Sequence, residues 1–198
     1  IEELARTYAD EIITDTLGNL IVHKKGAGPR VMFAAHMDSI GFIVTHIEKE
    51  GFLRVGKLGG IAPKEAVYSA VRFKNGVQGV FVPEEKADFG KLKLDECFID
   101  IGAADEEEAK KLVQVGDTAV YDRSIRTRGG RVMGPYLDDR IACAVLLCAL
   151  AQIERPTHDL YLVFTVQEEV GLRGAKTAAW WAEPDIGIAV DVTDVDDT

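Results

Sequence analysis

Acidic side chains and a histidine recur where short apolar segments of the chain end. The segments cover residues 30–35, 160–166 and 186–190, and such continuous apolar runs are typical of strands buried on both faces of a parallel sheet. The polar residues that follow them are His36, Asp38, Glu168, Glu169 and Asp191. Another acidic pair, Asp138-Asp139, opens a long apolar segment. Because the carboxyl ends of parallel strands meet at one edge of a sheet, we expect these side chains to converge there.

Imidazole nitrogen and carboxylate oxygen together suit zinc, cobalt or manganese. Several carboxylates in a small space repel one another, and one or two divalent cations would remove that repulsion. Each element also has a plainer interpretation, because a lone histidine at a strand end is more often structural and an acidic pair before a helix can be an ordinary N-cap. The recurrence at one topological position favours a metal centre.

The elements that would position these residues form an α/β domain, residues 1–43 and 132–198, with a β-rich insertion at 44–131. Helices are predicted at 2–13, 105–112, 139–153 and 172–182. The helix at 139–153 is apolar nearly all round, which predicts burial on every side. The insertion carries short β-branched segments at 42–48, 52–58, 67–73, 77–82 and 117–121, mostly separated by glycine-containing turns. This pattern is typical of a small antiparallel β-unit.

Composition narrows the class of protein. The chain has 198 residues, 47% of them hydrophobic and 28% charged, which is ordinary globular composition. Its formal net charge of −10 argues against nucleic acid or an anionic membrane as a partner. No apolar run approaches the ~18 residues of a membrane span, and residues 1–4 lack a signal pattern. The odd number of cysteines, without a CxxC motif, favours a reducing, cytoplasmic location.

Four motifs resemble those of the glutamyl and tetrahedral aminopeptidases, two-metal enzymes that are sometimes named endoglucanases. The motifs are Ala35–Gly41, Leu137–Arg140, Gln167–Gly171 and Val190–Thr193. Their order and spacing match over nearly the whole chain, and the family carries a β-barrel insertion between the first two motifs. The resemblance therefore implies a metallopeptidase domain interrupted by a β-barrel-like insertion that serves assembly.

The resemblance also implies a role for each residue. His36 and Asp191 would bind one metal, Glu169 the other, and Asp138 would bridge the two. Asp38 would fix the tautomer of His36 by accepting a hydrogen bond from its other ring nitrogen, and Asp139 would support the geometry without being a ligand. Glu168 would be the general base for a metal-bridging water that hydrolyses the amino-terminal peptide bond. The implied cofactors are two zinc or cobalt ions, with manganese also compatible, and the implied assembly is a homo-oligomer, either a dimer or a larger shell.

Some positions depart from the family pattern. The family has a second histidine ligand far toward the C-terminus, whereas this chain has no histidine after His158. Ser39 stands where the family commonly has an acid. We therefore expect a chain truncated at both ends, with one metal ligand missing. Two alternatives stay open, a non-catalytic fragment that serves assembly only and a glycan-cleaving hydrolase.

Overall fold

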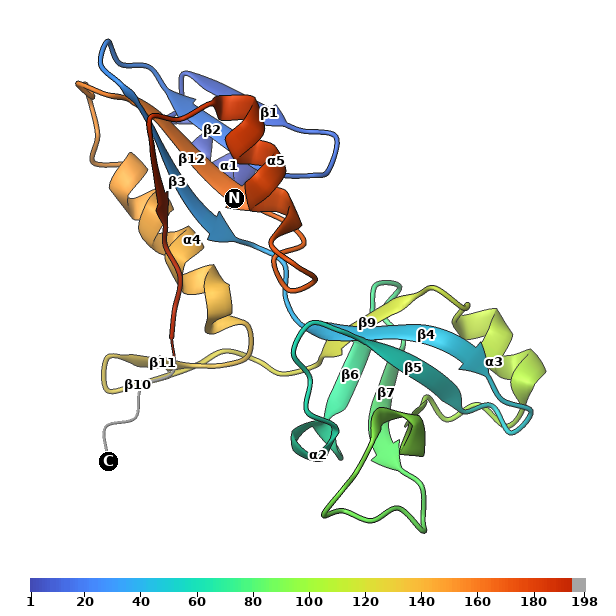
Figure 1. Cartoon of the computed structure of the whole chain (residues 1–198). Coiled ribbons are helices and arrows are strands. Elements are labelled where there is room, and N and C mark those ends of the chain that lie inside the picture. The colour runs from blue at the N-terminus through green and yellow to red at the C-terminus, as the bar shows by residue number, and fades with distance from the viewer. Residues whose placement is uncertain (194–198) are drawn as a thin grey trace. The chain divides into compact units, whose positions relative to one another are not determined.

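The computed structural model describes residues 1–193 and divides the chain into two compact units (Figure 1). One unit combines Ile1–Asp38 with the chain from Tyr136 onward, and the other is Ser39–Pro135. The sequence placed these boundaries at 43/44 and 131/132, a few residues inside the second unit. The difference arises because strand β4 already begins at Gly41 and belongs wholly to the second unit.

The first unit is built on a five-stranded sheet. Its strands run in the order β1-β2-β12-β3-β13. Their bounds are β1 Glu11–Thr14, β2 Leu20–Lys24, β12 Asp159–Thr165, β3 Arg30–His36 and β13 Ile186–Ala189. β3 is parallel to both β12 and β13, whereas β2 is antiparallel to β12 and β1 is antiparallel to β2. Thr165 lies opposite His36 in the register, so the loops that follow β12 and β3 leave the same edge.

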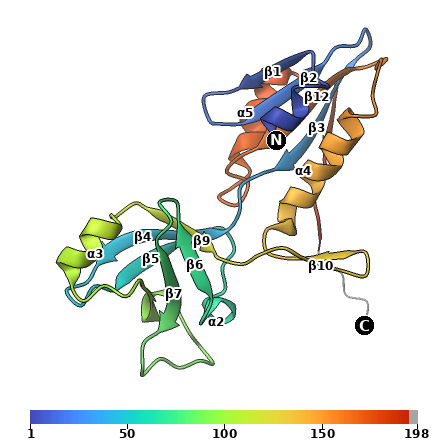
Figure 2. The same ribbon diagram turned by 180° about the vertical axis from the view of Figure 1, so that it is seen from behind.

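Helices cover both faces of this sheet (Figures 1 and 2). α1 (Glu2–Ala5) and α4 (Leu137–Leu150) pack on one face with Leu20, Val22 and Phe164, and α5 (Arg173–Ala182) packs on the other with Ile21 and Val163. Alternate residues of β2 and β12 therefore enter opposite cores, as the pleat of a strand requires. The predicted α/β architecture with a parallel centre is confirmed.

Two predictions about secondary structure near the ends of the chain are wrong. The helix predicted at 2–13 ends at Ala5, and Glu11–Thr14 forms β1 instead. The β-branched residues Ile12, Ile13 and Thr14 favour a strand, and β2 offers them a hydrogen-bonding partner. The segment 186–190 is not a buried strand, because β13 pairs only with β3 at the sheet edge and its four residues are exposed.

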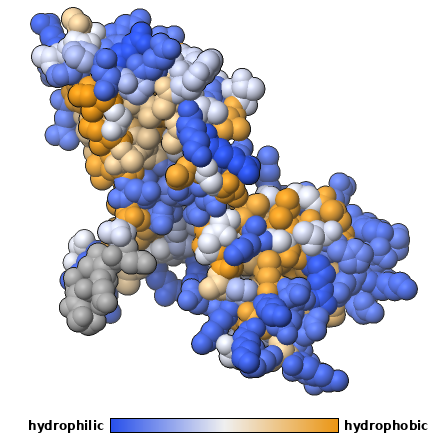
Figure 3. Space-filling view, viewed as in Figure 1, coloured by the Kyte–Doolittle hydropathy of each residue, from blue (hydrophilic) through white to orange (hydrophobic). Residues whose placement is uncertain are grey.

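The helix α4 is apolar nearly all round but is buried on one side only. Ala142, Cys143, Leu146 and Leu150 face the core, whereas the side of the helix that carries Val145 is exposed. Figure 3 shows hydrophobic side chains at the surface of this unit. The prediction that α4 is buried on every side is therefore wrong. An apolar composition shows that a helix can be buried, but the neighbouring elements determine which of its sides are covered. Within residues 1–193, no helix has the length and apolar character needed to cross a membrane.

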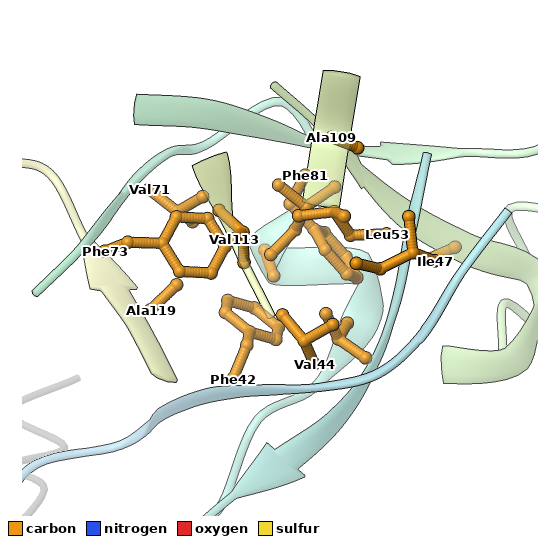
Figure 4. Packing of buried hydrophobic residues seen from close by; sticks show 14 of the residues in the cluster. Phe42, Val44, Ile47, Leu53, Val71, Phe73, Phe81, Ala109, Val113 and Ala119 are labelled. Carbon is orange, nitrogen blue, oxygen red and sulfur yellow. The ribbon is translucent and has the colours of Figure 1, made fainter. Parts of the chain in front are cut away.

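The second unit is a closed antiparallel barrel, which confirms the predicted β-barrel-like insertion. Its strands follow the order β4-β5-β8-β7-β6-β9. They are β4 Gly41–Ile47, β5 Leu53–Leu58, β6 Ala70–Phe73, β7 Gln78–Pro83, β8 Cys97–Asp100 and β9 Thr118–Tyr121. The remaining elements are α2 Pro63–Ala66, a 3-10 turn Leu94–Glu96, α3 Glu106–Leu112 and the hairpin β10 Arg126–Arg128 with β11 Arg131–Met133. Large side chains such as Phe42, Phe81 and Leu53 meet in the interior (Figure 4).

Candidate metal centre

His36 is the last residue of β3, and its backbone is held by the start of α4. Its N–H donates to Asp139 Oδ2 over 3.1 Å, and the Cys143 thiol donates to its carbonyl over 3.2 Å. The residue is buried, with only 4% of its surface exposed. Its Nε2 lies 2.9 Å from Asp138 Oδ1 and 3.9 Å from Glu168 Oε2. One imidazole nitrogen therefore faces carboxylates from two other segments of the chain.

The other imidazole nitrogen faces Asp38. Nδ1 lies 3.2 Å from the Asp38 carbonyl oxygen and 3.6 Å from the carboxylate oxygen Oδ1. The hydrogen-bond partner is thus the backbone carbonyl, not the side chain that the family resemblance implied. An Nδ1–H donated to this carbonyl leaves Nε2 with its lone pair, the form that binds metals.

The Asp38 carboxylate holds the loop after β12. It accepts hydrogen bonds from the N–H groups of Glu168 and Glu169, over 3.1 and 3.2 Å. Both residues are half-buried. Because Asp38 fixes their backbone from the side of β3, the segment that presents two neighbouring acids is tied to the segment that presents His36.

Asp138 and Asp139 begin α4 without helical backbone angles. Asp139 is completely buried, and its Oδ1 has no hydrogen-bond partner among the described residues. Burial, reinforced by the negative charge of Asp191, raises the pKa of Asp139 to about 6. A buried carboxylate oxygen without a partner is costly unless a cation or proton completes its environment.

The charges of the site shift two further pKa values. Burial disfavours the imidazolium form of His36, but Asp138, Asp38 and Glu168 outweigh this effect and raise its pKa. Burial raises the pKa of Glu169, and Asp138, Glu168 and Asp38 add to the rise against the opposing effect of His36. The site thus concentrates negative charge, which a divalent cation would balance.

Two overlapping groups of side chains offer ligand atoms within 4.8 Å of one another. They are His36 with Asp139 and Asp191, and His36 with Glu168 and Glu169. The donor set, one imidazole with several carboxylates, suits zinc, cobalt or manganese, and the first group includes Asp139, whose Oδ1 has no hydrogen-bond partner in the described range of the chain. The residues present therefore fit a divalent metal.

All six predicted site residues lie around this centre, but their arrangement differs from the implied one at the aspartates as well as at the contact of Asp38 with His36. Asp139, expected only to support the geometry, supplies an atom to the group that contains Asp191, whereas Asp138 contacts His36 directly. Two other residues of the region were not singled out as functional, Cys143 behind His36 and Asn19 beside the loop after β12. No local motif in the sequence marks either of them, because their contacts with the site are to residues more than a hundred positions away.

Comparison with known proteins agrees with the fold. The family model of the M42 glutamyl aminopeptidases matches residues 18–198, and the chain belongs to this family. It is similar to the lysyl aminopeptidase of Pyrococcus furiosus, with 40% identity over 98% of this chain and 59% of that protein. An aminopeptidase structure from the archaeon Desulfurococcus kamchatkensis superposes with a TM-score of 0.93 and 40% identity, over 100% of this chain and 57% of that one.

A third similar protein is a peptidase of Pyrococcus horikoshii that can assemble into a tetrahedron or a large octahedral shell. The TM-score is 0.86 and the identity 34%, over 96% of this chain and 61% of that one. The chain therefore spans about three fifths of the length of the proteins it matches.

Proposed function

We propose that this chain carries the catalytic centre of a metal-dependent aminopeptidase that hydrolyses amino-terminal residues from peptides. The observation that carries the proposal is the convergence on His36 of carboxylates from three other segments, at the edge where parallel strands end. Membership of the M42 glutamyl aminopeptidase family supports it. The name endoglucanase also occurs among the similar structures, for a protein of Thermotoga maritima that is 32% identical. A glycan-cleaving activity is nevertheless not favoured, because the matching family model and the relatives matched by sequence are named aminopeptidases.

The residues divide into two ligand groups. His36 and Asp191 would hold one divalent ion, with Asp139 close enough to contribute, and Glu169 would hold a second. Asp138, whose Oδ1 is next to His36 Nε2, would lie between them. Bound zinc or cobalt would act as a Lewis acid on the scissile carbonyl and make water acidic enough to be a nucleophile at neutral pH.

Glu168 is the proposed general base. Its carboxylate would accept a proton from the attacking water and return it to the leaving amine. Its backbone N–H and that of Glu169 are held by Asp38, so the backbone from which the two carboxylates project is fixed. Asp38 would thus act on catalysis by positioning both glutamates and His36, without reacting itself.

The test combines metal analysis with a panel of aminoacyl chromogenic substrates. We expect cleavage that chelator abolishes and that zinc or cobalt restores. Glu168→Gln should lower kcat by about 10²- to 10⁴-fold, because the proton acceptor is lost while metal content is kept. Glu50→Gln, an exposed substitution in the barrel unit, is the matched control and should leave kcat unchanged. Chelator-resistant cleavage, or full activity of Glu168→Gln, would contradict the proposal.

We also propose that the barrel unit mediates self-assembly, as its position in the family implies. Large apolar side chains of this unit are exposed, among them Tyr68 (66%), Ile125 (63%) and Met133 (51%). The similar Pyrococcus horikoshii protein assembles into closed shells. Light scattering coupled to size exclusion should give a mass of at least a dimer, and a monomer at micromolar concentration would contradict the proposal.

A further inference from the structure

The loop that carries Glu168 and Glu169 begins and ends at residues that lie against each other. Val166 follows β12, Gly174 stands in the first turn of α5, and the Gly174 N–H donates to the Val166 carbonyl over 3.0 Å. Gln167 and Leu172 have φ values of 57° and 56°, which residues other than glycine seldom adopt. Such a backbone persists only when its surroundings determine it.

The side chain of Asn19 bridges both ends of this loop. Its Oδ1 accepts the N–H of Val166 over 3.0 Å, and its Nδ2 donates to the Gly174 carbonyl over 3.0 Å and to Thr177 Oγ1 over 3.0 Å. Asn19 is completely buried. A methyl group on Gly174 would lie 2.4 Å from Asn19 Oδ1 and 2.2 Å from the Val166 carbonyl oxygen, so this close approach requires glycine.

Asn19 is itself held by the turn that precedes β2. Asp15 Oδ2 accepts from Asn19 Nδ2 over 2.6 Å, while Asp15 Oδ1 accepts from the N–H groups of Leu17, Gly18 and Asn19, each over 2.9 Å. The Asn19 amide group is therefore fully hydrogen-bonded and fixed in one orientation. A rigid turn thus projects a rigid side chain into the base of the loop.

From this geometry we propose that Asn19 is a positioning residue for the metal centre, which acts through the loop 166–174. Asp38 fixes the loop at Glu168 and Glu169, and Asn19 fixes it at its two ends. Together they would set where the two glutamate carboxylates lie relative to His36. The inference rests on the proposed function, because it assigns the loop a role in metal binding.

A double variant in which Asp15 and Asn19 exchange their residue types separates the role of Asn19 in the loop from its role in the turn. In the double variant Asp15→Asn/Asn19→Asp the net charge is unchanged. The amide at position 15 can still accept the three N–H groups of the turn and can donate to the carboxylate at 19. The carboxylate at 19 can still accept from Val166, but the Gly174 carbonyl loses the donor from residue 19, keeps only that of Thr177 Oγ1 among these side chains, and faces a negative charge. The turn is kept, and the bridge across the loop is broken.

The experiment measures the metal-free and the metal-bound chain. Hydrogen exchange at the amides of Glu168 and Glu169 should be at least about tenfold faster in the exchanged variant and in Asn19→Ala, because a buried hydrogen bond of the loop is lost. Titration with Co²⁺ should show at least about tenfold weaker binding and an altered visible absorption spectrum. Ile21→Val, a core substitution in the adjacent strand, is the control for general destabilisation and should leave loop exchange and the cobalt spectrum unchanged.

The outcomes distinguish the two proposals. If the wild-type chain binds no Co²⁺, the proposed function fails, and the exchange measurement alone decides whether Asn19 holds the loop. If the wild type binds Co²⁺ and the Asn19 variants match it in affinity, spectrum and loop exchange, the positioning role is overturned. Equal changes in Ile21→Val would overturn it as well, because the effect would then be one of stability alone.

Discussion

Asp139 combines complete burial, an unpartnered carboxylate oxygen and a pKa raised to about 6 from 3.8. Without metal, ionising this side chain opposes folding. Its contribution to stability is therefore fully present below about pH 4 and is lost as the pH rises through about 6. A bound cation would remove this penalty, so the same residue would link metal binding to pH.

We therefore expect Asp139→Asn to flatten the pH dependence of stability in chelator. Between pH 4 and pH 7 the wild type should lose roughly 2 to 3 kcal/mol of unfolding free energy relative to this variant. The amide keeps an oxygen that can accept from the His36 N–H. Urea unfolding at a series of pH values measures the difference, and the exposed Glu50→Gln serves as control. Parallel curves for wild type and Asp139→Asn would contradict the expectation.

The residues of the site could be predicted from sequence to the extent that strand ends reveal them. His36, Asp38, Glu168, Glu169 and Asp191 each follow a predicted strand, and the topology brings those ends together. The direction in which a side chain points cannot be predicted from such a pattern. The placement of Asp139 beside Asp191 depends on the backbone at the start of α4. The contacts of Asn19 with Val166 and Gly174 span 147 and 155 positions of the sequence.

At the scale of elements, α4 shows that burial of an apolar residue depends on packing as well as on composition. Leu146 is 4% exposed and packs on the sheet, whereas the neighbouring Val145 is 53% exposed. Nothing in the apolar run that contains both residues distinguishes them, because each is a good core residue. The distinction follows from which side of the helix meets β3 and β12, and this depends on the fold as a whole.

Paired substitutions on α4 test that orientation. Leu146→Ala should cost about 2 to 5 kcal/mol of unfolding free energy, because it leaves a cavity in the core between helix and sheet. Val145→Ala should change it by less than about 0.5 kcal/mol, because little buried area is lost. Urea unfolding monitored by circular dichroism measures both. Similar losses for the two variants would mean that α4 packs differently.

The barrel could be predicted only in outline. Five β-branched segments separated by turns indicated an antiparallel unit, and five strands lie at or near those positions. β8 was missed because Cys97–Asp100 contains a single β-branched residue, Ile99, and lies in a stretch with several acidic residues. Closure of the barrel depends on β8, since it pairs with both β5 and β7. Closure depends on the pairing of all the strands and cannot be predicted from the sequence pattern of any one segment.

At the scale of the whole molecule, the two units share no hydrophobic core cluster within the part of the chain that the structure describes. The barrel core draws all its buried residues from Phe42 to Ala119, and the two cores of the sheet unit draw theirs from outside that range. Closure removes the exposed strand edges that would otherwise invite pairing with other chains. Each unit thus has the means to bury its own apolar surface.

This separation predicts that residues 39–135 fold when expressed alone. Their ends, Ser39 and Pro135, are the boundaries at which the chain passes between the two units. The excised segment should melt in one cooperative transition. Phe81→Ala should abolish that transition or lower its midpoint strongly, because Phe81 is completely buried and stacks on Phe42 at 4.8 Å between ring centroids. A matched substitution of an exposed phenylalanine outside the barrel core, Phe89→Ala, should leave the midpoint nearly unchanged. Non-cooperative melting of the unmodified segment would show that the barrel needs the sheet unit to fold, despite its own core.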